Sequence, residues 1–171
     1  GIATCDSIGI SRTIEVHLSH PLGQCSFSLL GEALNVFDGS SLYSPGWLPE
    51  GWTLRTEGPG HFEPEQGRYW TRQWSLPDDG MCPTSEPLEL TEGAADLIDG
   101  FPLETGEATV GEYDINGASA TYSTSPDSGV ARLSWTIDDH GFVLTALQVC
   151  LDSTPPSLDD MLQFARSLTP P

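Results

Sequence analysis

The residues with the most distinctive chemistry in this sequence are the arginines and tryptophans of one segment, Arg68–Leu76 (RYWTRQWSL). Alternate side chains of an extended strand point to the same face, so Arg68, Trp70, Arg72 and Trp74 share one face. If that face is buried, Arg72 needs a carboxylate partner or must stack on the indoles, because an unpaired buried guanidinium is costly. If the face is partly open, the four side chains form a cation–π ladder for an acidic or sugar ligand. Both interpretations remain open, and these four residues are the candidate binding site.

The histidines and paired aspartates do not suggest a catalytic or metal centre. The histidines stand at positions 17, 20, 61 and 140, and no GxSxG nucleophile motif accompanies them. His17 and His20 alternate badly on the strand expected there, which disfavours a metal pair. The adjacent aspartates at 78–79, 138–139 and 159–160 fit turns and a helix start better than facing acid–base carboxylates. We therefore expect no catalytic residue, no metal and no cofactor; a hydrolase would need its nucleophile and base to converge around a histidine.

The cysteines indicate an exported protein. They occur at positions 5, 25, 82 and 150, and none belongs to a CxxC pair. An even number at wide spacing is typical of disulfides formed outside the cytoplasm. Three connectivities are possible, and we favour Cys5–Cys25 with Cys82–Cys150, which on loop-closure arguments contribute about 3 and 4 kcal/mol. The expected location is extracytoplasmic, at the cell surface or secreted.

The charge balance is strongly acidic. The chain of 171 residues has 25 acidic residues against six basic ones, all arginine, for a formal net charge of −19. Such a surface repels nucleic-acid phosphates and anionic lipid headgroups, which excludes nucleic acid as a partner. A partner with a basic surface is one interpretation, and a solvated surface in a salt-adapted organism is another. No stretch of 18 or more apolar residues is present, so we expect no transmembrane helix in this sequence.

The N-terminal 43 residues read as a strand and a helix. Thr13–Ser19 alternates apolar and polar residues, which predicts a strand. The following CSFSLLGEALNVFDG is ambiguous, but Phe27, Leu30, Leu34 and Phe37 recur at helical spacing and favour a helix. Residues 39–45 then connect this segment to the remainder. We predict residues 1–43 as a separate segment packed on a main domain of residues 44–171.

From Trp52 onward the pattern is that of short β-strands. Strands are predicted at 52–57, 68–76, 87–92, 107–114, 118–123, 130–137 and 142–150. Asn116-Gly117 is a strong signal for a tight hairpin between two of them. Phe142–Cys150 is apolar on both faces, which indicates a central strand.

The end of the chain predicts a helix with a capped start. Ser157 is the expected N-cap, Asp160 completes a short-armed capping box, and Leu158, Met161 and Leu162 begin an apolar stripe. The predicted fold class is α+β, with a mostly antiparallel sheet of five to seven strands and a C-terminal helix packed on one face.

Two of the five tryptophans lie close together in SPGWLPEGWTL, residues 44–54. Prolines and glycines frame Trp47 and Trp52, which indicates a rigid turn. Large aromatic side chains serve cores more often than ligands, so we expect both to wedge the start of the sheet against the C-terminal helix. The alternative is an exposed aromatic platform for a glycan or a protein.

Five segments in order carry a resemblance to a known family. They are WLPEGWTL at 47–54, LELTEG at 88–93, VGEYDINGASATY at 110–122, LSWTIDDHGFVLTAL at 133–147 and SLDDMLQFARSL at 157–168. Residues 44–169 thus resemble a bacterial extracytoplasmic domain family of unknown function with an LPxGY-type entry motif. They are loosely similar to the C-terminal domain of the MucB/RseB regulators. The family's tyrosines are replaced here by Trp52 and Phe142, and Cys82 and Cys150 are additions.

The resemblance implies a role in the cell envelope. Relatives occur on lipoproteins and in the outer portions of anti-sigma-factor-like proteins, and their motifs determine the fold without supplying catalytic residues. We therefore expect a non-catalytic sensor or regulatory interaction domain of a membrane-anchored bacterial protein, with an envelope protein as partner. The alternative is a carrier module that binds a lipid or a glycan.

Overall fold

The computed structural model describes residues 27–29, 32–34, 37, 39–59, 69–76, 88–96, 101, 106–125, 128–148 and 155–171. Several predictions fall outside these residues. They concern the strand at 13–19, all four cysteines with both disulfides, Arg68, and the histidines at 17, 20 and 61.

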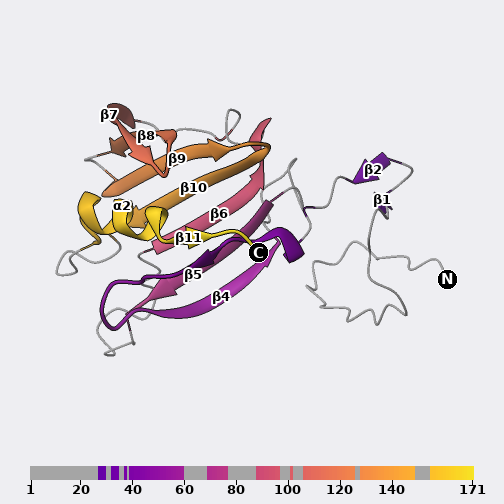
Figure 1. The fold of residues 1–171 in the computed structure, drawn as a ribbon, viewed down its shortest axis with the longest axis horizontal. Helices are drawn as coiled ribbons and strands as arrows, with labels where there is room; N and C mark the ends of the chain where they lie inside the picture. Colours follow the sequence, from indigo (N-terminus) through magenta and orange to yellow (C-terminus); the bar gives the residue numbers. More distant parts are fainter. Residues whose placement is uncertain are drawn as a thin grey trace.

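The centre of the molecule is a seven-stranded sheet with the order β4-β5-β6-β10-β9-β8-β7 (Figure 1). From edge to edge, the strands are β4 (Thr53–Pro59), β5 (Tyr69–Ser75), β6 (Leu88–Ala94), β10 (His140–Leu147), β9 (Val130–Ile137), β8 (Ala118–Ser125) and β7 (Ala108–Ile115). Every neighbouring pair is antiparallel. Together with a C-terminal helix, this confirms the predicted α+β class.

The tight turn between β7 and β8 follows from its two residues. Asn116 and Gly117 both have positive φ, at 52° and 92°, as a two-residue hairpin turn requires. Asparagine and glycine adopt this conformation most easily, which explains why the sequence signal was correct.

The C-terminal strand of the sheet lies at its centre, as predicted. β10 pairs with β6 on one side and β9 on the other. Its residues from Gly141 to Thr145 are buried, as is Ala146. A strand covered on both faces must be apolar on both, and the sequence of β10 meets that requirement.

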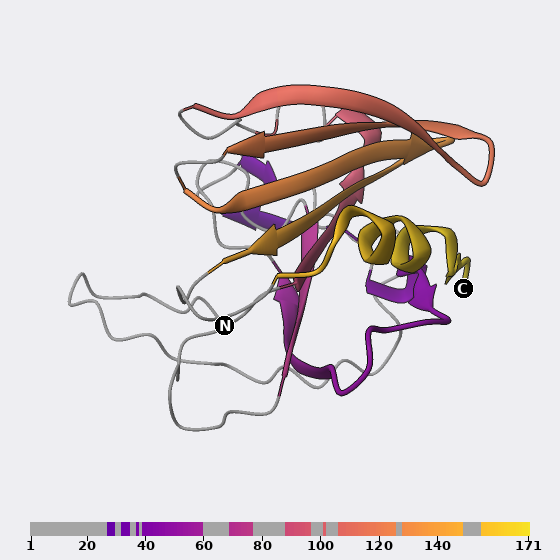
Figure 2. The ribbon, with the colours of Figure 1, turned by 90° about the vertical axis from the view of Figure 1, so that its left-hand side faces the viewer.

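The helix α2 (Leu158–Arg166) lies on the concave side of the sheet, which curves around it (Figures 1 and 2). The predicted capping box is present: Asp160 N donates to Ser157 Oγ at 3.2 Å, and Ser157 N donates to Asp160 Oδ2 at 2.9 Å. Met161 and Phe164 are fully buried and join the core of the sheet. Within the described residues no helix has the length and apolarity to span a membrane.

A second, two-stranded sheet joins distant parts of the chain. β3 (Ser44–Pro45) pairs antiparallel with β11 (Leu168–Thr169), directly after α2. The chain continues from β3 into the tryptophan turn, where Trp47 N donates to Ser167 Oγ at 3.0 Å. Trp47 and Trp52 both pack against the core, which agrees with the wedge that the sequence predicted.

The helix predicted around residues 27–37 is wrong. Two three-residue strands occur there, β1 (Phe27–Leu29) and β2 (Glu32–Leu34), and they pair with Phe27 opposite Leu34. A short apolar run fits both periods, and only two residues separate these strands, which is the length of a tight hairpin. The hairpin lies beyond the end of the large sheet in Figure 1.

Candidate functional site

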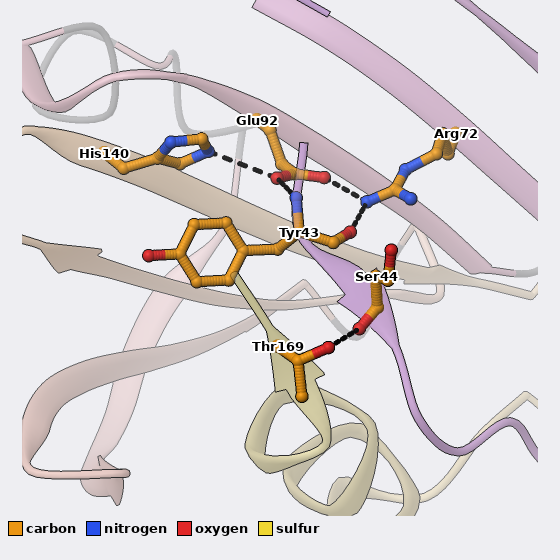
Figure 3. A network of polar contacts seen from close by, with 6 residues as sticks. All are labelled: Tyr43, Ser44, Arg72, Glu92, His140 and Thr169. Carbon is orange, nitrogen blue, oxygen red and sulfur yellow. Dashed lines mark hydrogen bonds and ion pairs between the residues drawn. The ribbon is translucent and has the colours of Figure 1, made fainter. Parts of the chain in front are cut away.

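The most organised polar group in the structure surrounds Glu92 of β6. Its side chain is completely buried on the concave face of the sheet. Oε1 accepts a hydrogen bond from Arg72 Nη2 of β5, and Oε2 accepts one from the backbone N–H of Tyr43 at 2.9 Å. His140 Nε2 of β10 lies 3.1 Å from the same Oε2 and donates to it when that nitrogen carries the hydrogen (Figure 3). Three donors from three separate segments thus converge on one carboxylate.

Tyr43 is held through both of its backbone groups. Its N–H donates to Glu92, and its carbonyl oxygen accepts from Arg72 Nη2, the nitrogen that also donates to Glu92 (Figure 3). We call Arg72 and Glu92 the backbone clamp. Glu92 accepts the hydrogen bond from the backbone N–H, and Arg72 donates to the backbone carbonyl oxygen. A pair of this kind can hold the backbone of one residue, through the two peptide groups that flank it, without reading its side chain.

Aromatic side chains form one side of the site. The Tyr43 ring makes edge contacts with His140 and Phe142, with centroid separations of 5.0 Å in both cases. His140 stacks on Phe142 at 4.6 Å, and Phe37 meets His140 edge-on at 5.3 Å. We call Phe37, Tyr43, His140 and Phe142 the aromatic cluster. It fixes the imidazole ring in place and shields the hydrogen bonds of the clamp from water.

The structure places the predicted arginine–tryptophan face under other parts of the chain. Arg72 is 8% exposed and stacks over Trp74 at 5.6 Å, besides its bond to Glu92. Trp74 is buried against Phe164 of α2, and Trp70 lies beneath Gly39, close to its backbone. Arg72 therefore has both the carboxylate and the indole contact that the buried interpretation requires. Of the described members of the predicted face, Arg72 and Trp74 are buried and Trp70 is half-buried.

Two donors in this face have no acceptor among the described residues. They are Nε of Arg72 and Nε1 of Trp70, and both atoms are buried. An unsatisfied buried donor costs about 1–3 kcal/mol. Residues 39–45, which cover this face in the structure, thus leave these two donors of the face without an acceptor.

A second buried ion pair lies on the opposite face of the sheet. Arg132 Nη1 of β9 donates to Glu107 Oε2 at 2.7 Å, and Ser123 Oγ of β8 donates to the other carboxylate oxygen. The Arg132 guanidinium also lies over the ring of Phe101, 5.5 Å from its centroid. This group joins β8, β9 and the residue before β7, so its evident role is to hold one end of the sheet together.

Sequence reasoning missed most members of the site, among them Tyr43, Glu92 and His140. A signal for Glu92 was available, because it follows Leu88 and Leu90 on the apolar face of a strand expected to run antiparallel to Arg68–Leu76. His140 lies outside the predicted strand 142–150, whereas it is the first residue of β10 and lies beside Glu92. Tyr43 binds through its backbone, for which a side-chain pattern gives no signal.

The described residues contain no group of three or more His, Cys, Asp or Glu side chains placed to hold a metal ion. Chemically, the site shown here can bind the backbone N–H and carbonyl oxygen of one residue together with its aromatic ring. The chain matches no protein-family model, and no curated protein or solved structure is significantly similar to it.

Proposed function

We propose that this chain is a non-catalytic interaction domain that acts outside the cytoplasm, as the sensor or regulatory part of a membrane-anchored bacterial protein. The observation that carries the proposal is the acidic excess of the described surface. The location is inferred from the motifs of residues 44–169 and from the cysteines, and the charge supports a protein partner with a basic surface.

The buried ion pairs remove basic residues from the surface of the described part of the chain. Four of the six arginines are described, and two of them, Arg72 and Arg132, are buried in pairs with glutamates. The exposed basic side chains that remain are Arg55 and Arg166. The exposed acidic residues are Glu50, Glu57, Asp96, Glu112, Asp114, Asp138, Asp139 and Asp159. The described surface therefore keeps eight exposed acidic residues against two exposed basic ones, an excess close to that of the whole composition, which favours a basic partner and fast, salt-sensitive association.

The alternative, a carrier for a lipid or glycan, needs an open concave face. In the described part of the molecule that face is packed by Met161, Phe164 and Leu168, which are all buried. We therefore place the carrier second. It would require α2 to move away from the sheet.

Native mass spectrometry after incubation with envelope extract from the source organism tests the proposal. We expect an adduct with the mass of a protein, which weakens as ionic strength rises towards about 0.5 M because surface charges are then screened. An adduct with the mass of a lipid or glycan supports the carrier instead. If the chain is recovered only in its free form at low ionic strength, the proposal is contradicted.

A charge-reversal variant makes the test specific. Glu57→Lys with Glu112→Lys changes exposed positions on the two edge strands β4 and β7. Thr53→Gln with Thr109→Gln changes exposed positions on the same strands without altering charge. We expect the first variant to lose most of the adduct and the second to retain it. Equal retention by both variants means that the acidic surface does not carry the interaction.

A further inference from the structure

From the geometry of the backbone clamp we propose that Arg72 and Glu92 form a peptide-binding site, which residues 39–45 of the same chain occupy in the structure. The ligand is an extended segment of a partner protein that bears an aromatic residue and is flanked by basic residues. This inference rests on the proposed function and deepens it, because it names the chemistry of the partner.

The bound segment itself shows what the site recognises. The clamp takes the N–H and the carbonyl oxygen of a single residue, and the ring of that residue enters the aromatic cluster. The next residues extend the pairing, because Ser44 and Pro45 lie opposite Thr169 and Leu168 of β11. Any extended peptide with an aromatic residue before a short strand can make the same contacts, in the manner of strand addition.

No residue of the segment that fills the site is fully buried. The 3-10 turn η1 (Gly39–Ser41) contains no buried residue, and β3 has two residues. The side chain of Tyr43 is half-buried. When the segment leaves, Arg72 and Glu92 still pair with each other, so neither charge is left alone. Displacement therefore costs far less than breaking the ion pair would.

The site also has capacity that its own segment does not use. Arg72 Nε and Trp70 Nε1 are buried and have no acceptor in the described part of the chain. A segment that supplies a carbonyl or hydroxyl oxygen within reach of either atom would satisfy a donor that residues 39–45 leave unpaired. A partner can thus bind better than residues 39–45 do.

The net charge indicates whether the peptide bound by the clamp comes from a partner protein or from a second copy of this chain. Each copy has a formal net charge of −19, so exchange of segments between two copies brings like charges together. A segment flanked by lysine or arginine is instead attracted to the described acidic surface. We therefore assign the site to a basic partner.

Fluorescence anisotropy with synthetic peptides tests the assignment on the full chain. The probe is the sequence of residues 39–46 with two lysines at each end, KKGSSLYSPGKK. We expect the Tyr43→Ala chain, whose own segment is weakened, to bind this probe at least tenfold more tightly than the wild type. The same peptide with an N-methyl group on the tyrosine amide cannot donate to Glu92, and it should bind at least tenfold more weakly. The version flanked by glutamates, EEGSSLYSPGEE, should also bind more weakly at low salt.

Equal binding of the probe and its N-methylated form overturns the inference, as does absence of binding to a folded Tyr43→Ala chain. Dimers in analytical ultracentrifugation of that variant, without peptide binding, would assign the site to a second copy instead and overturn the assignment to a partner.

If the variant does not fold, hydrogen exchange of the wild-type chain decides. The probe should then speed exchange of the Tyr43 amide and leave β10 unchanged, and unaltered exchange at Tyr43 contradicts the site. A partner found in envelope extract with no peptide binding leaves the proposed function standing and removes only this inference.

Discussion

At the scale of single residues, Glu92 is a fully buried carboxylate that connects three parts of the chain. Its carboxylate satisfies donors from β5, β10 and the segment before β3, so three elements depend on one side chain. The clamp is therefore both a stabilising contact and the proposed recognition site. Substitution of Glu92 should therefore affect the stability of the chain.

We predict that Glu92→Leu lowers the free energy of unfolding by about 3–5 kcal/mol, because it leaves the buried Arg72 without its carboxylate. The double variant Glu92→Leu/Arg72→Met removes both charges and should recover much of that loss. Urea denaturation followed by tryptophan fluorescence measures both. Glu112→Leu, at an exposed position, is the matched control and should change stability by less than about 0.5 kcal/mol. A loss below about 1 kcal/mol for Glu92→Leu contradicts the role assigned to the ion pair.

Tyr122 on β8 predicts a dependence of stability on alkaline pH. Burial raises the pKa of its hydroxyl above 10.0, and the nearby Tyr113 raises it further. The native state then keeps a proton that the unfolded state has lost, so the stability contribution is present below about pH 10 and falls as pH rises through the native pKa.

The Tyr122→Phe variant isolates this effect. It lacks the hydroxyl, so its unfolding free energy should fall less steeply than that of the wild type as the pH increases from about 9.5 to 11.5. Chemical denaturation at a series of pH values measures the difference between the two curves. Parallel curves mean that Tyr122 titrates alike in the native and unfolded states.

The candidate site could be predicted only in part. The sequence showed that a buried Arg72 requires a carboxylate, and the structure supplies one. Which carboxylate it is depends on the register between β5 and β6, where Trp70 lies opposite Glu92 and Arg72 opposite Leu90. Register depends on the hydrophobic pattern along whole strands and on the geometry of the turns between them, so a short segment does not determine it. The contribution of Tyr43 is made by backbone atoms, which every residue has.

At the scale of elements, the parts with a local cause were predicted correctly. Asn116-Gly117 determines the β7–β8 hairpin, and Ser157 with Asp160 determines the start of α2. The failures have non-local causes. β11 consists of two residues whose strand character comes from pairing with β3, about 125 residues away. The β1–β2 hairpin was mistaken for a helix because its apolar spacing fits both periods.

Two glycines provide a matched test of the hairpin. Gly117 has φ of 92°, and Gly58 lies in the edge strand β4; a Cβ atom at either would meet no neighbouring atom. We predict that Gly117→Ala lowers the unfolding free energy by about 1 kcal/mol or more, since alanine is strained at positive φ. Gly58→Ala should be neutral or slightly stabilising, because it only reduces the freedom of the unfolded chain. Thermal unfolding measures both, and equal effects would contradict a role for backbone strain in the turn.

At the scale of the whole molecule, charge and curvature act together. The sheet curves around α2 and encloses an apolar core, while two arginines are withdrawn into buried pairs. The described surface that remains is mainly acidic, and its charges repel one another in the compact state. Repulsion between these surface charges therefore opposes folding, and its strength depends on the salt concentration.

We predict that sodium chloride stabilises the chain. Raising the concentration from about 10 mM to 0.5 M shortens the range of repulsion between exposed carboxylates and should raise the melting temperature, whereas the buried ion pairs are little screened. The variant Glu57→Gln/Glu112→Gln removes two exposed negative charges and should show a smaller increase. Circular dichroism at each salt concentration provides the measurement. A melting temperature that falls with salt means that attractive surface pairs outweigh the repulsion.

The pairing of β3 with β11 also has a consequence for the order of events during synthesis. Pro45 meets Leu168, and Gly46 N donates to the carbonyl oxygen of Ser167 at 3.1 Å. A ribosome that has released the first hundred residues has delivered Tyr43 and its clamp, but not the strand that fixes β3 beside them. Contacts of such long sequence separation form slowly, because a large loop must close before they are made. The recognition site should therefore be open on the nascent chain and close only after residues 167–169 have emerged.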